Sequence, residues 1–479
     1  MSARLRSRIT VAWILAFGLV ACQGATAPSV PIESTAAPAA TEPAPAATTA
    51  AVPFAQSALA ALQELDSDRL TLAPVHPATG RALQGYEPID LGANFHYDFT
   101  SDRSSLILAR YPSAEGSFAE LHFLDLPTWT EATGLQLPTR GWTSAHAVSA
   151  DGNRFAIATV ETRRSTVWLV DAAACILLKH IDTPLYVAGM DFSSDSERLM
   201  IYGQQERVDT GLSQGPPIAE LRSAQDLGLL WSRTLESVRD GFEPNDQFKG
   251  EAHEPGAGTT YRPGIAFAPI SDSLYLVHAD AQRLTGVDFA RKRVLTLDIQ
   301  PRLSWFEGFL ALGAGTAHAK VQDGTERRAI VSPDGEIIYT LGLQNKFTKP
   351  SNGDWELTQT ALQLQAIRSL DAAELYRSEA AGESLSPSGD SHTILVHRWD
   401  YAAGGPGATI EVNAVNGAIL REAAGLDLRP TRRMDGSPLL VSAAPRGGQG
   451  ATTMSAFAPD GTPLGSWETP RYGDWLLVP

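Results

Sequence analysis

One pentapeptide in the chain has the pattern of a hydrolase nucleophile. Residues 211–215 read Gly-Leu-Ser-Gln-Gly and match G-x-S-x-G, with Ser213 at the central position. In enzymes with that pattern the serine occupies a sharp turn between a strand and a helix and has Asp and His partners. Here Pro216 and Pro217 follow directly, and no alternating strand–helix pattern surrounds the motif. We interpret the segment as a loop and predict no catalytic residue from it.

Acidic side chains gather in a second segment, residues 236–263. This segment contains Asp240, Glu243, Asp246, Glu251, His253 and Glu254. Oxygen ligands suit Ca²⁺, but the spacing is not that of an EF-hand loop. A solvated acidic loop is therefore the preferred interpretation, and a Ca²⁺ site in 236–263 is the alternative.

The histidines and cysteines predict no metal centre and no other cofactor. Five of the ten histidines lie at or near expected strands, namely His96, His146, His278, His392 and His397, and the sequence has no HExxH motif. Two cysteines exclude a disulfide-dense scaffold and a four-cysteine zinc site. Cys175 lies in an apolar stretch, VWLVDAAACILLKHI, which predicts a buried, unpaired thiol.

Composition narrows the classes of partner. The chain has 479 residues, 43% hydrophobic and 19% charged, which is enough for one large core or several ordinary ones. The formal net charge of -16 disfavours a duplex nucleic-acid partner, since such proteins need a basic face.

The N-terminus has the pattern of an export signal. Three arginines precede an apolar run from Ile9 to Val20 that is too short to cross a bilayer comfortably. The run ends in Leu19-Val20-Ala21-Cys22, which resembles the lipobox of bacterial lipoproteins. This resemblance implies that residues 1–22 are a signal peptide and that Cys22 is lipidated. Gln23 resembles the pattern that is exported to the outer membrane of a diderm. In a monoderm the anchor would lie on the outer face of the plasma membrane.

A tether and a repeat follow. Residues 23–60 begin with an Ala/Pro/Thr-rich stretch that cannot bury a core, and only residues 55–65 favour a short helix. From 61 to 479 an apolar strand, a Ser/Asp/Gly turn and a second strand recur. The turns are centred on Asp102, Asp151, Asp195, Asp272, Asp334, Ser388 and Asp435. We interpret the aspartates as turn-formers.

These turn sequences resemble those of WD40-like and YVTN-like β-propellers, although the Trp-Asp ending of true WD40 repeats is missing. The resemblance implies an all-β propeller of seven or eight four-stranded blades. Residues 69–86 form an unmatched N-terminal strand pair, and YGDWLLVP at 472–479 resembles a first strand. Mixing these two ends in one composite blade favours eight blades and leaves no open sheet edge. If 472–479 only caps the ring, there are seven.

Loop lengths predict which face is functional. In a four-stranded blade the second turn and the connection to the next blade lie on one face, and the extra length falls there, at 203–217, 236–263, 302–325 and 343–357 among others. These loops and their flanks hold the candidate partner-binding aromatics Phe242, Phe248, Tyr261, Trp305, Phe306, Phe347, Trp355, Trp399 and Tyr401. Aromatic rings beside carboxylates suit a protein or glycan partner. The alternative is that the rings fold back to cap the loops.

The sequence therefore predicts a lipid-anchored extracytoplasmic β-propeller that binds or scaffolds an envelope protein or glycan. The alternative is a propeller enzyme, a lactonase or glycan-active hydrolase. That alternative predicts acidic or histidine side chains that converge at the central channel. Whether the chain has any catalytic activity is left open by the sequence.

Overall fold

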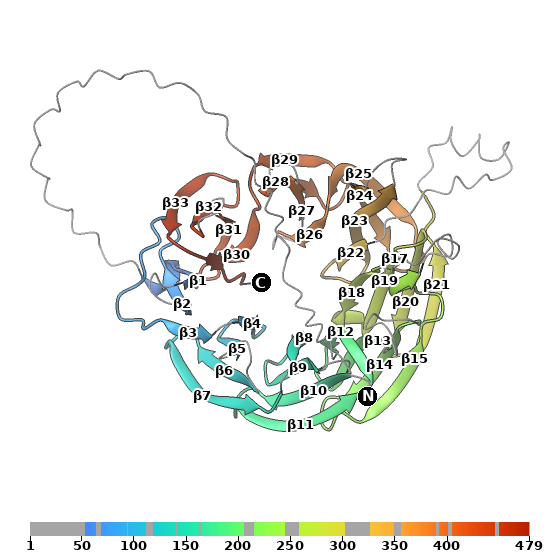
Figure 1. The fold of residues 1–479 in the computed structure, drawn as a ribbon, viewed down its shortest axis with the longest axis horizontal. Helices are drawn as coiled ribbons and strands as arrows, with labels where there is room; N and C mark the ends of the chain where they lie inside the picture. The colour runs from blue at the N-terminus through green and yellow to red at the C-terminus, as the bar shows by residue number, and fades with distance from the viewer. Residues whose placement is uncertain are drawn as a thin grey trace, which may run out of the picture. The chain divides into compact units, whose positions relative to one another are not determined.

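Antiparallel pairing of consecutive strands builds the described part of the chain. The computed structural model describes residues 53–478, except for 64–68, 93, 112–117, 140, 162–163, 206–214, 245–257, 302–325, 349–355, 389–391, 401–404 and 446–449. Within these residues the strands form eight four-stranded sheets, arranged as the blades of a ring around a central axis (Figure 1). This confirms the all-β propeller and decides for eight blades over seven.

Blades 1 to 4 follow one another along the chain, each with its first strand nearest the axis. Blade 1 is β4 (Asn94–Phe99), β5 (Ser105–Tyr111), β6 (Ala119–Asp125) and β7 (Thr130–Leu137). Blade 2 is β8 (Trp142–Val148), β9 (Arg154–Glu161), β10 (Arg164–Asp171) and β11 (Ile176–Thr183). Blade 3 is β12 (Leu185–Phe192), β13 (Arg198–Gln205), β14 (Ile218–Ser223) and β15 (Leu229–Thr234). Blade 4 is β18 (Gly264–Ala268), β19 (Ser273–Val277), β20 (Arg283–Asp288) and β21 (Arg293–Asp298).

Blades 5 to 7 repeat the plan. Blade 5 is β22 (Glu326–Val331), β23 (Ile337–Thr348), β24 (Glu356–Arg368) and β25 (Glu374–Gly382). Blade 6 is β26 (Ser384–Pro387), β27 (Thr393–Asp400), β28 (Gly405–Asn413) and β29 (Ile419–Ala424). Blade 7 is β30 (Arg429–Arg432), β31 (Pro438–Pro445), β32 (Thr452–Phe457) and β33 (Pro463–Thr469). The described part of the chain also has two 3-10 turns, η1 (Phe54–Gln56) and η3 (Pro269–Ser271). None of the helical segments that the structure describes is long and apolar enough to cross a membrane.

Blade 8 closes the ring with both ends of the chain. The C-terminal strand β34 (Gly473–Trp475) lies innermost and pairs with β1 (Ala58–Gln63), followed outward by β2 (Leu70–Val75) and β3 (Ile89–Gly92). The composite blade is thus confirmed, with three N-terminal strands instead of the expected pair. The helix predicted at residues 55–65 is wrong. That segment is β1, because two strands remote in sequence supply its hydrogen bonds and override its local helix preference.

The repeated aspartates hold the first turn of each of several blades. The carboxylates of Asp102, Asp151, Asp195, Asp334 and Asp435 each accept the backbone N–H two residues later, at 2.8–3.1 Å. In the first four turns the Ser or Thr hydroxyl two residues earlier also donates to the carboxylate. These hydrogen bonds lower the pKa of all five carboxyl groups. The interpretation of these residues as turn-formers is confirmed.

The core lies between neighbouring blades. Along β5, Leu106 and Leu108 pack against blade 8, where they meet Leu72. Ile107, the residue between them, packs against Phe155 of blade 2. This alternation is the period of two that a strand buried on both faces requires. Each blade is therefore held between two apolar contacts, and its innermost strand is fixed at the edge of the channel.

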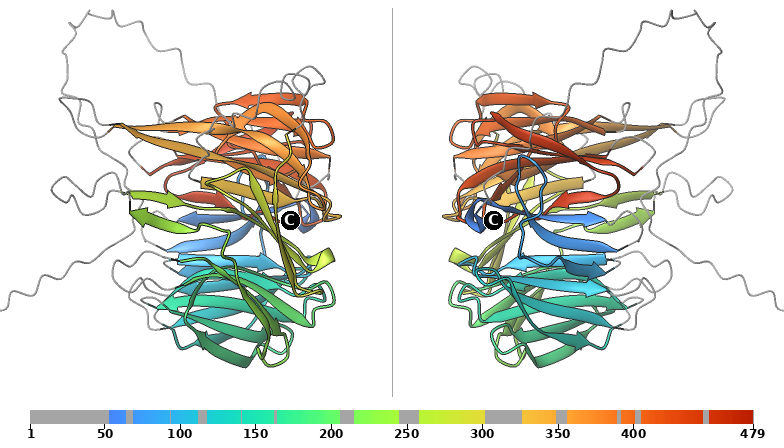
Figure 2. Two further views of the ribbon diagram at one scale, coloured as in Figure 1. Left: turned by 90° about the vertical axis from the view of Figure 1, so that its right-hand side faces the viewer. Right: turned by 90° about the vertical axis from the view of Figure 1, so that its left-hand side faces the viewer.

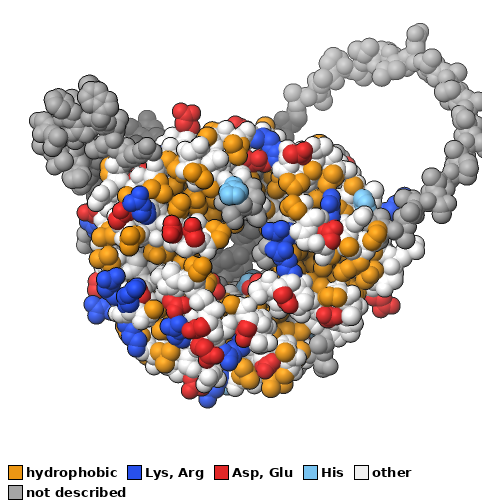
Figure 3. All heavy atoms as spheres, turned by 180° about the vertical axis from the view of Figure 1, so that it is seen from behind, with side chains coloured by type: hydrophobic (Ala, Val, Ile, Leu, Met, Phe, Trp, Pro, Cys, Tyr) orange, Lys and Arg blue, Asp and Glu red, His pale blue; other side chains and the backbone are white. Residues whose placement is uncertain are grey.

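Extended hairpins project from one side of the ring. A two-stranded sheet, β16 (Gly241–Pro244) with β17 (Gly258–Tyr261), joins blades 3 and 4, and the long strands β23 and β24 of blade 5 reach out on the same side (Figure 2). We call this side the long-loop face and the opposite side the tight-turn face. Figure 3 shows the tight-turn face, where apolar, acidic and basic side chains alternate around a central hollow.

Candidate functional site

Two neighbouring cavities, which share lining residues, are bordered by innermost strands of the ring. The larger, about 520 Å³, is lined by residues of the innermost strands of blades 1 to 6. The smaller, about 290 Å³, lies beside the first turns of blades 1 and 2 and shares His146 and Met190 with the larger one. A cavity with a few converging polar groups is the default ligand site of a rigid scaffold.

Titratable side chains of three successive blades meet in these cavities. His146 of β8 lies with Nδ1 3.4 Å from an Oδ atom of Asp98 on β4. The His96 ring, also on β4, has its centroid 6.2 Å from that of His146. Asp191 of β12 lines the smaller cavity together with Asp98 and His146. Each side chain is placed by a strand whose neighbours are packed on both sides, so the group is preorganised.

Burial shifts the proton affinity of two of these groups. It raises the pKa of Asp191 to about 7, and the nearby charge of Asp98 adds to the rise. Burial lowers the pKa of His96 to about 4, and the neighbouring His146 contributes. A carboxyl group that titrates near neutral pH beside an imidazole–carboxylate pair is suited to proton transfer or to a ligand that carries a charge.

The channel carboxylates share one local geometry. Asp98, Asp191 and Asp474 each accept the backbone N–H of the following residue, at 2.8–2.9 Å. This bond turns the carboxylate back onto its own strand and fixes one oxygen. The opposite wall is different, because Ile265, Phe267 and other apolar side chains of blades 4 and 5 line it together with Arg327 and Arg328. The channel thus has one wall of histidines and carboxylates and one wall of apolar residues and arginines.

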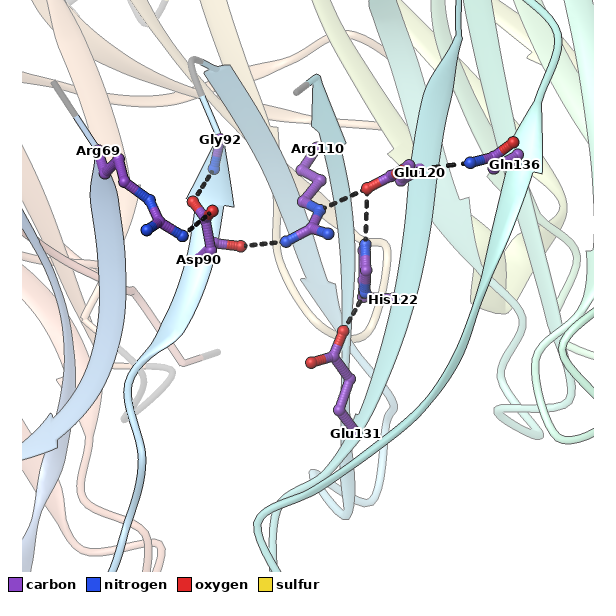
Figure 4. Close-up of polar contacts among 8 residues, drawn as sticks. All are labelled: Arg69, Asp90, Gly92, Arg110, Glu120, His122, Glu131 and Gln136. Atoms are coloured by element: carbon purple, nitrogen blue, oxygen red, sulfur yellow. Dashed lines mark hydrogen bonds and ion pairs between the residues drawn. The ribbon is translucent and has the colours of Figure 1, made fainter. Parts of the chain in front are cut away.

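A second polar cluster fills the junction between blades 8 and 1 (Figure 4). Arg110 donates to Glu120 at 2.8 Å and to the Asp90 carbonyl oxygen at 2.7 Å. His122 lies between Glu120 and Glu131 and is paired with both. Its ring lies over Gly134, where a Cβ atom would approach to 3.1 Å. The groups satisfy one another across the composite junction, so we assign this cluster to ring closure.

A third set of polar contacts joins strands to the connections between blades. Tyr202 of β13 donates to Asp240 at 2.6 Å, and both side chains are buried. Burial raises the pKa of both groups. Asp240 was predicted to belong to a solvated loop, and this is wrong for that residue. Its carboxylate turns inward because the phenol of Tyr202 would otherwise be buried without a partner.

Two buried histidines in blades 4 and 6 have hydroxyl partners. In blade 4, Nε2 of His278 lies 2.7 Å from Oγ1 of Thr285, and both side chains are fully buried. In blade 6, Nε2 of His397 lies 3.0 Å from Oγ of Ser386, and Nδ1 lies 2.7 Å from Oδ1 of Asp427. The spacing of these residues along the chain has no diagnostic pattern, so sequence analysis missed the second network.

The structure describes only part of the predicted partner-binding set. Tyr261, at the end of β17, is half-buried, and the guanidinium of Arg239 lies 5.6 Å from its ring centroid. Trp399 is half-buried near the end of β27, and Phe242 and Phe347 belong to β16 and β23. Phe248, Trp305, Phe306, Trp355, Tyr401 and the lipidation residue Cys22 lie outside the described residues, as do Ser213 and residues 245–257 of the proposed Ca²⁺ loop.

Two exposed aromatics were not predicted. Trp142, the first residue of β8, is 53% exposed, and Tyr472, just before β34, is 44% exposed. Both lie at the long-loop end of innermost strands. In the sequence, each of these two aromatic residues stands where a strand begins and not within the strand, and this position could have indicated its exposure. Cys175 also differs from expectation. It occupies a turn with φ of 55° and is half-buried, and burial raises the pKa of its thiol.

In the part of the chain that the structure describes, no group of three or more His, Cys, Asp or Glu side chains is arranged to hold a metal ion.

The comparisons with known proteins concern the fold alone. No family model and no curated protein sequence matches the chain. Among solved structures, the chain is similar to a dihydro-heme d1 dehydrogenase, NirN, with a TM-score of 0.50, 11% identity, and coverage of 90% of this chain and 77% of that one. It is also similar to BamB from Moraxella catarrhalis, with a TM-score of 0.40, 11% identity, and coverage of 85% and 90%. At such identity these similarities concern the β-propeller architecture alone.

Proposed function

We propose that the protein is a lipid-anchored, extracytoplasmic β-propeller that binds a protein partner of the cell envelope through its long-loop face. The observation that carries this proposal is the position of Trp142 and Tyr472, each about half exposed at that face beside the channel. Half-buried Trp399 and Tyr261 lie at the same face. Aromatic side chains that keep contact area available on a rigid scaffold are typical anchors of protein interfaces.

Site-specific photocrosslinking in intact cells tests the partner surface. A photoreactive side chain at position 142 or 472 is expected to capture a discrete envelope protein. The same side chain at position 370, where Leu370 is 81% exposed in a turn of the opposite face, is the matched control. Equal capture from all three positions, or none from 142 and 472, contradicts the proposal.

Membrane attachment has its own test. The lipobox resemblance at Leu19-Val20-Ala21-Cys22 supports an anchor on Cys22. The Cys22→Ser form is expected to move from the membrane fraction to the soluble fraction of the envelope, with the same thermal melting temperature of the ring. Continued retention in the membrane fraction contradicts lipid anchoring and leaves the partner surface untouched.

A second candidate function is a hydrolase with its site in the channel. The observation that favours it is the convergence of His96, Asp98, His146 and Asp191 on neighbouring cavities. Metal analysis of the purified protein and hydrolysis of lactones and glycosides test it. A stoichiometric metal that is lost in Asp98→Ala, or turnover that is lost in His146→Ala, supports this function. Neither effect, in protein that is folded, contradicts it.

A further inference from the structure

The Ser386, His397 and Asp427 side chains form a linear network that the two candidate functions above do not use. Ser386 belongs to β26 and His397 to β27, and Asp427 lies in the connection that leads to β30. The contacts of 3.0 Å and 2.7 Å engage the two different nitrogens of one imidazole. Nε2 of His397 lies within hydrogen-bond distance of the Ser386 hydroxyl, and Nδ1 of the same ring lies at ion-pair distance from the Asp427 carboxylate. This order of groups can activate a hydroxyl nucleophile.

The carboxylate end of this network is held in place. Thr409, which is fully buried, accepts the N–H of Leu428 at 2.8 Å and donates to the carbonyl of Leu426 at 2.9 Å. These two bonds clamp the chain on both sides of Asp427. Arg429 binds Oδ2 of Asp427 through Nε and an Nη atom at 3.1 and 3.0 Å, which leaves Oδ1 for His397. Arg429 and His397 also lower the pKa of Asp427, although burial opposes them, so the group stays ionised.

The hydroxyl end of the network lies on the innermost strand, which borders the channel. His397 is 5% exposed, whereas Ser386 is half-buried on the innermost strand. The two residues that precede it, Ser384 and Leu385, line the cavity of about 520 Å³. Ser386 is the next residue along this strand and keeps part of its surface exposed, as the approach of a small acyl group to Oγ requires. The imidazole is shielded from bulk water, whereas the Asp427 side chain is 29% exposed.

We propose that Ser386 is a nucleophile activated by His397, with Asp427 as the positioning residue, and that it accepts the acyl group of small carboxylic esters. Oγ of Ser386 bonds to the acyl carbon as its proton passes to Nε2 of His397. The bond from the acyl carbon to the alcohol oxygen breaks, and that oxygen takes the proton from His397. Water then attacks the acyl-serine, gives a proton to His397, and releases the acid as the proton returns to Ser386.

Covalent labelling of the purified full-length protein with an alkyl fluorophosphonate tests the proposal. The reagent bonds through phosphorus to an activated serine oxygen and releases fluoride with the proton. The expected result is one adduct, mapped by mass spectrometry to Ser386. Ser386→Ala is expected to abolish labelling and to keep the wild-type melting temperature within a few degrees. An absence of adduct at Ser386 in the folded wild type overturns the proposal.

Two further measurements separate activation from mere exposure of the hydroxyl. Asp427→Asn is expected to slow labelling at least about tenfold, because Asp427 orients the imidazole and stabilises its charged form. Labelling of the wild type is expected to fall with decreasing pH only below about 6.5, since burial lowers the pKa of His397. Thr285→Val and Tyr202→Phe are matched controls that keep the wild-type rate within about twofold. A smaller effect of Asp427→Asn, or a rate independent of pH, overturns the proposal.

Discussion

Blades 4 and 6 contain the same pair of groups, an imidazole and a hydroxyl, in two different settings. In blade 4, His278 is 1% exposed and Thr285 is not exposed at all. In addition, Thr285 contacts Thr296 at 2.8 Å, which continues the chain of hydroxyls to Ser237. In blade 6, His397 is equally buried, but its hydroxyl partner Ser386 lies on the innermost strand beside the channel.

This difference separates a structural network from one that is able to act on a ligand. In blade 4 the histidine and its hydroxyl partner are both fully buried, so their contact contributes to stability and its loss leaves buried donors and acceptors unpaired. In blade 6 the hydroxyl partner is only half-buried, so its loss costs less because water can replace it. The same chemistry thus has two consequences, and the position of the hydroxyl decides which of them applies.

The largest expected effect is in blade 4. Thr285→Val keeps the shape of the side chain and removes the hydroxyl, which leaves His278 and the hydroxyl of Thr296 short of a buried partner. The free energy of unfolding is expected to fall by about 2–3 kcal/mol. Denaturant unfolding measures it, with Ser386→Ala as the matched variant in blade 6, expected to cost less than about 1 kcal/mol. Equal losses in the free energy of unfolding for Thr285→Val and Ser386→Ala would contradict the proposed difference between the networks of blades 4 and 6.

The second expected effect is a gain in the free energy of unfolding, and its size depends on pH. The pKa of Asp191 is raised to about 7, from an ordinary value of 3.8, so the folded protein binds the proton more tightly than the unfolded chain. Stability from this group is therefore present at low pH and is lost as pH rises from about 4 to above 7. Asp191→Asn is expected to be more stable than the wild type by roughly 2 kcal/mol at pH 8.

Melting curves at several pH values check the behaviour of Asp191. The gain of Asp191→Asn over the wild type is expected to shrink as the pH falls and to disappear near pH 4. A pH-independent gain would point to a packing effect of the amide. A loss at pH 8 would show that the channel carboxylate stabilises the fold, as the buried contact between His278 and Thr285 does.

The fold could be predicted from the sequence because the patterns that indicate it are local and repeated. Each turn aspartate binds a backbone N–H two residues away, so the pattern around Asp151 or Asp334 is visible without tertiary structure. Strand β1 was missed for the opposite reason. Its partners are β34, at the far end of the chain, and β2, and an Ala/Leu-rich segment has no strand signature until those partners are present.

The candidate sites were harder to predict from the sequence because they depend on which strands become neighbours in the fold. Asp98, His146 and Asp191 come from three blades, and only ring closure brings them to one cavity. Ser386 and His397 are 11 residues apart, but Asp427 comes from a connection after two further strands. Loop length drew attention to one face, and the function of that face stays a prediction. Loop length gave no information about the first residues of innermost strands, where Trp142 and Tyr472 are exposed.

A smaller effect is expected from Tyr202, which occupies in blade 3 the position that His397 occupies in blade 6. Each lies three residues after the strand residue that pairs with the end of the innermost strand. Tyr202→Phe removes one buried hydrogen bond to Asp240. The expected cost is about 1–2 kcal/mol by denaturant unfolding. A cost above that of Thr285→Val would mean that the connection after β15 depends on this bond more than the buried hydroxyl chain of blade 4 depends on Thr285.

The smallest expected effect is at the exposed end of the junction between blades 8 and 1. The Arg69 side chain is 62% exposed and pairs with Asp90 at 2.6 Å, whereas Arg110 in the same junction is 22% exposed and binds two groups. Exposed ion pairs are screened by water and contribute little. A double-mutant cycle of Arg69→Ala and Asp90→Ala is therefore expected to give a coupling energy below about 0.5 kcal/mol. A larger coupling energy would show that exposed polar contacts stabilise the closure of the ring. Exposure would then no longer predict that the polar contact in blade 6 contributes less to stability than the one in blade 4.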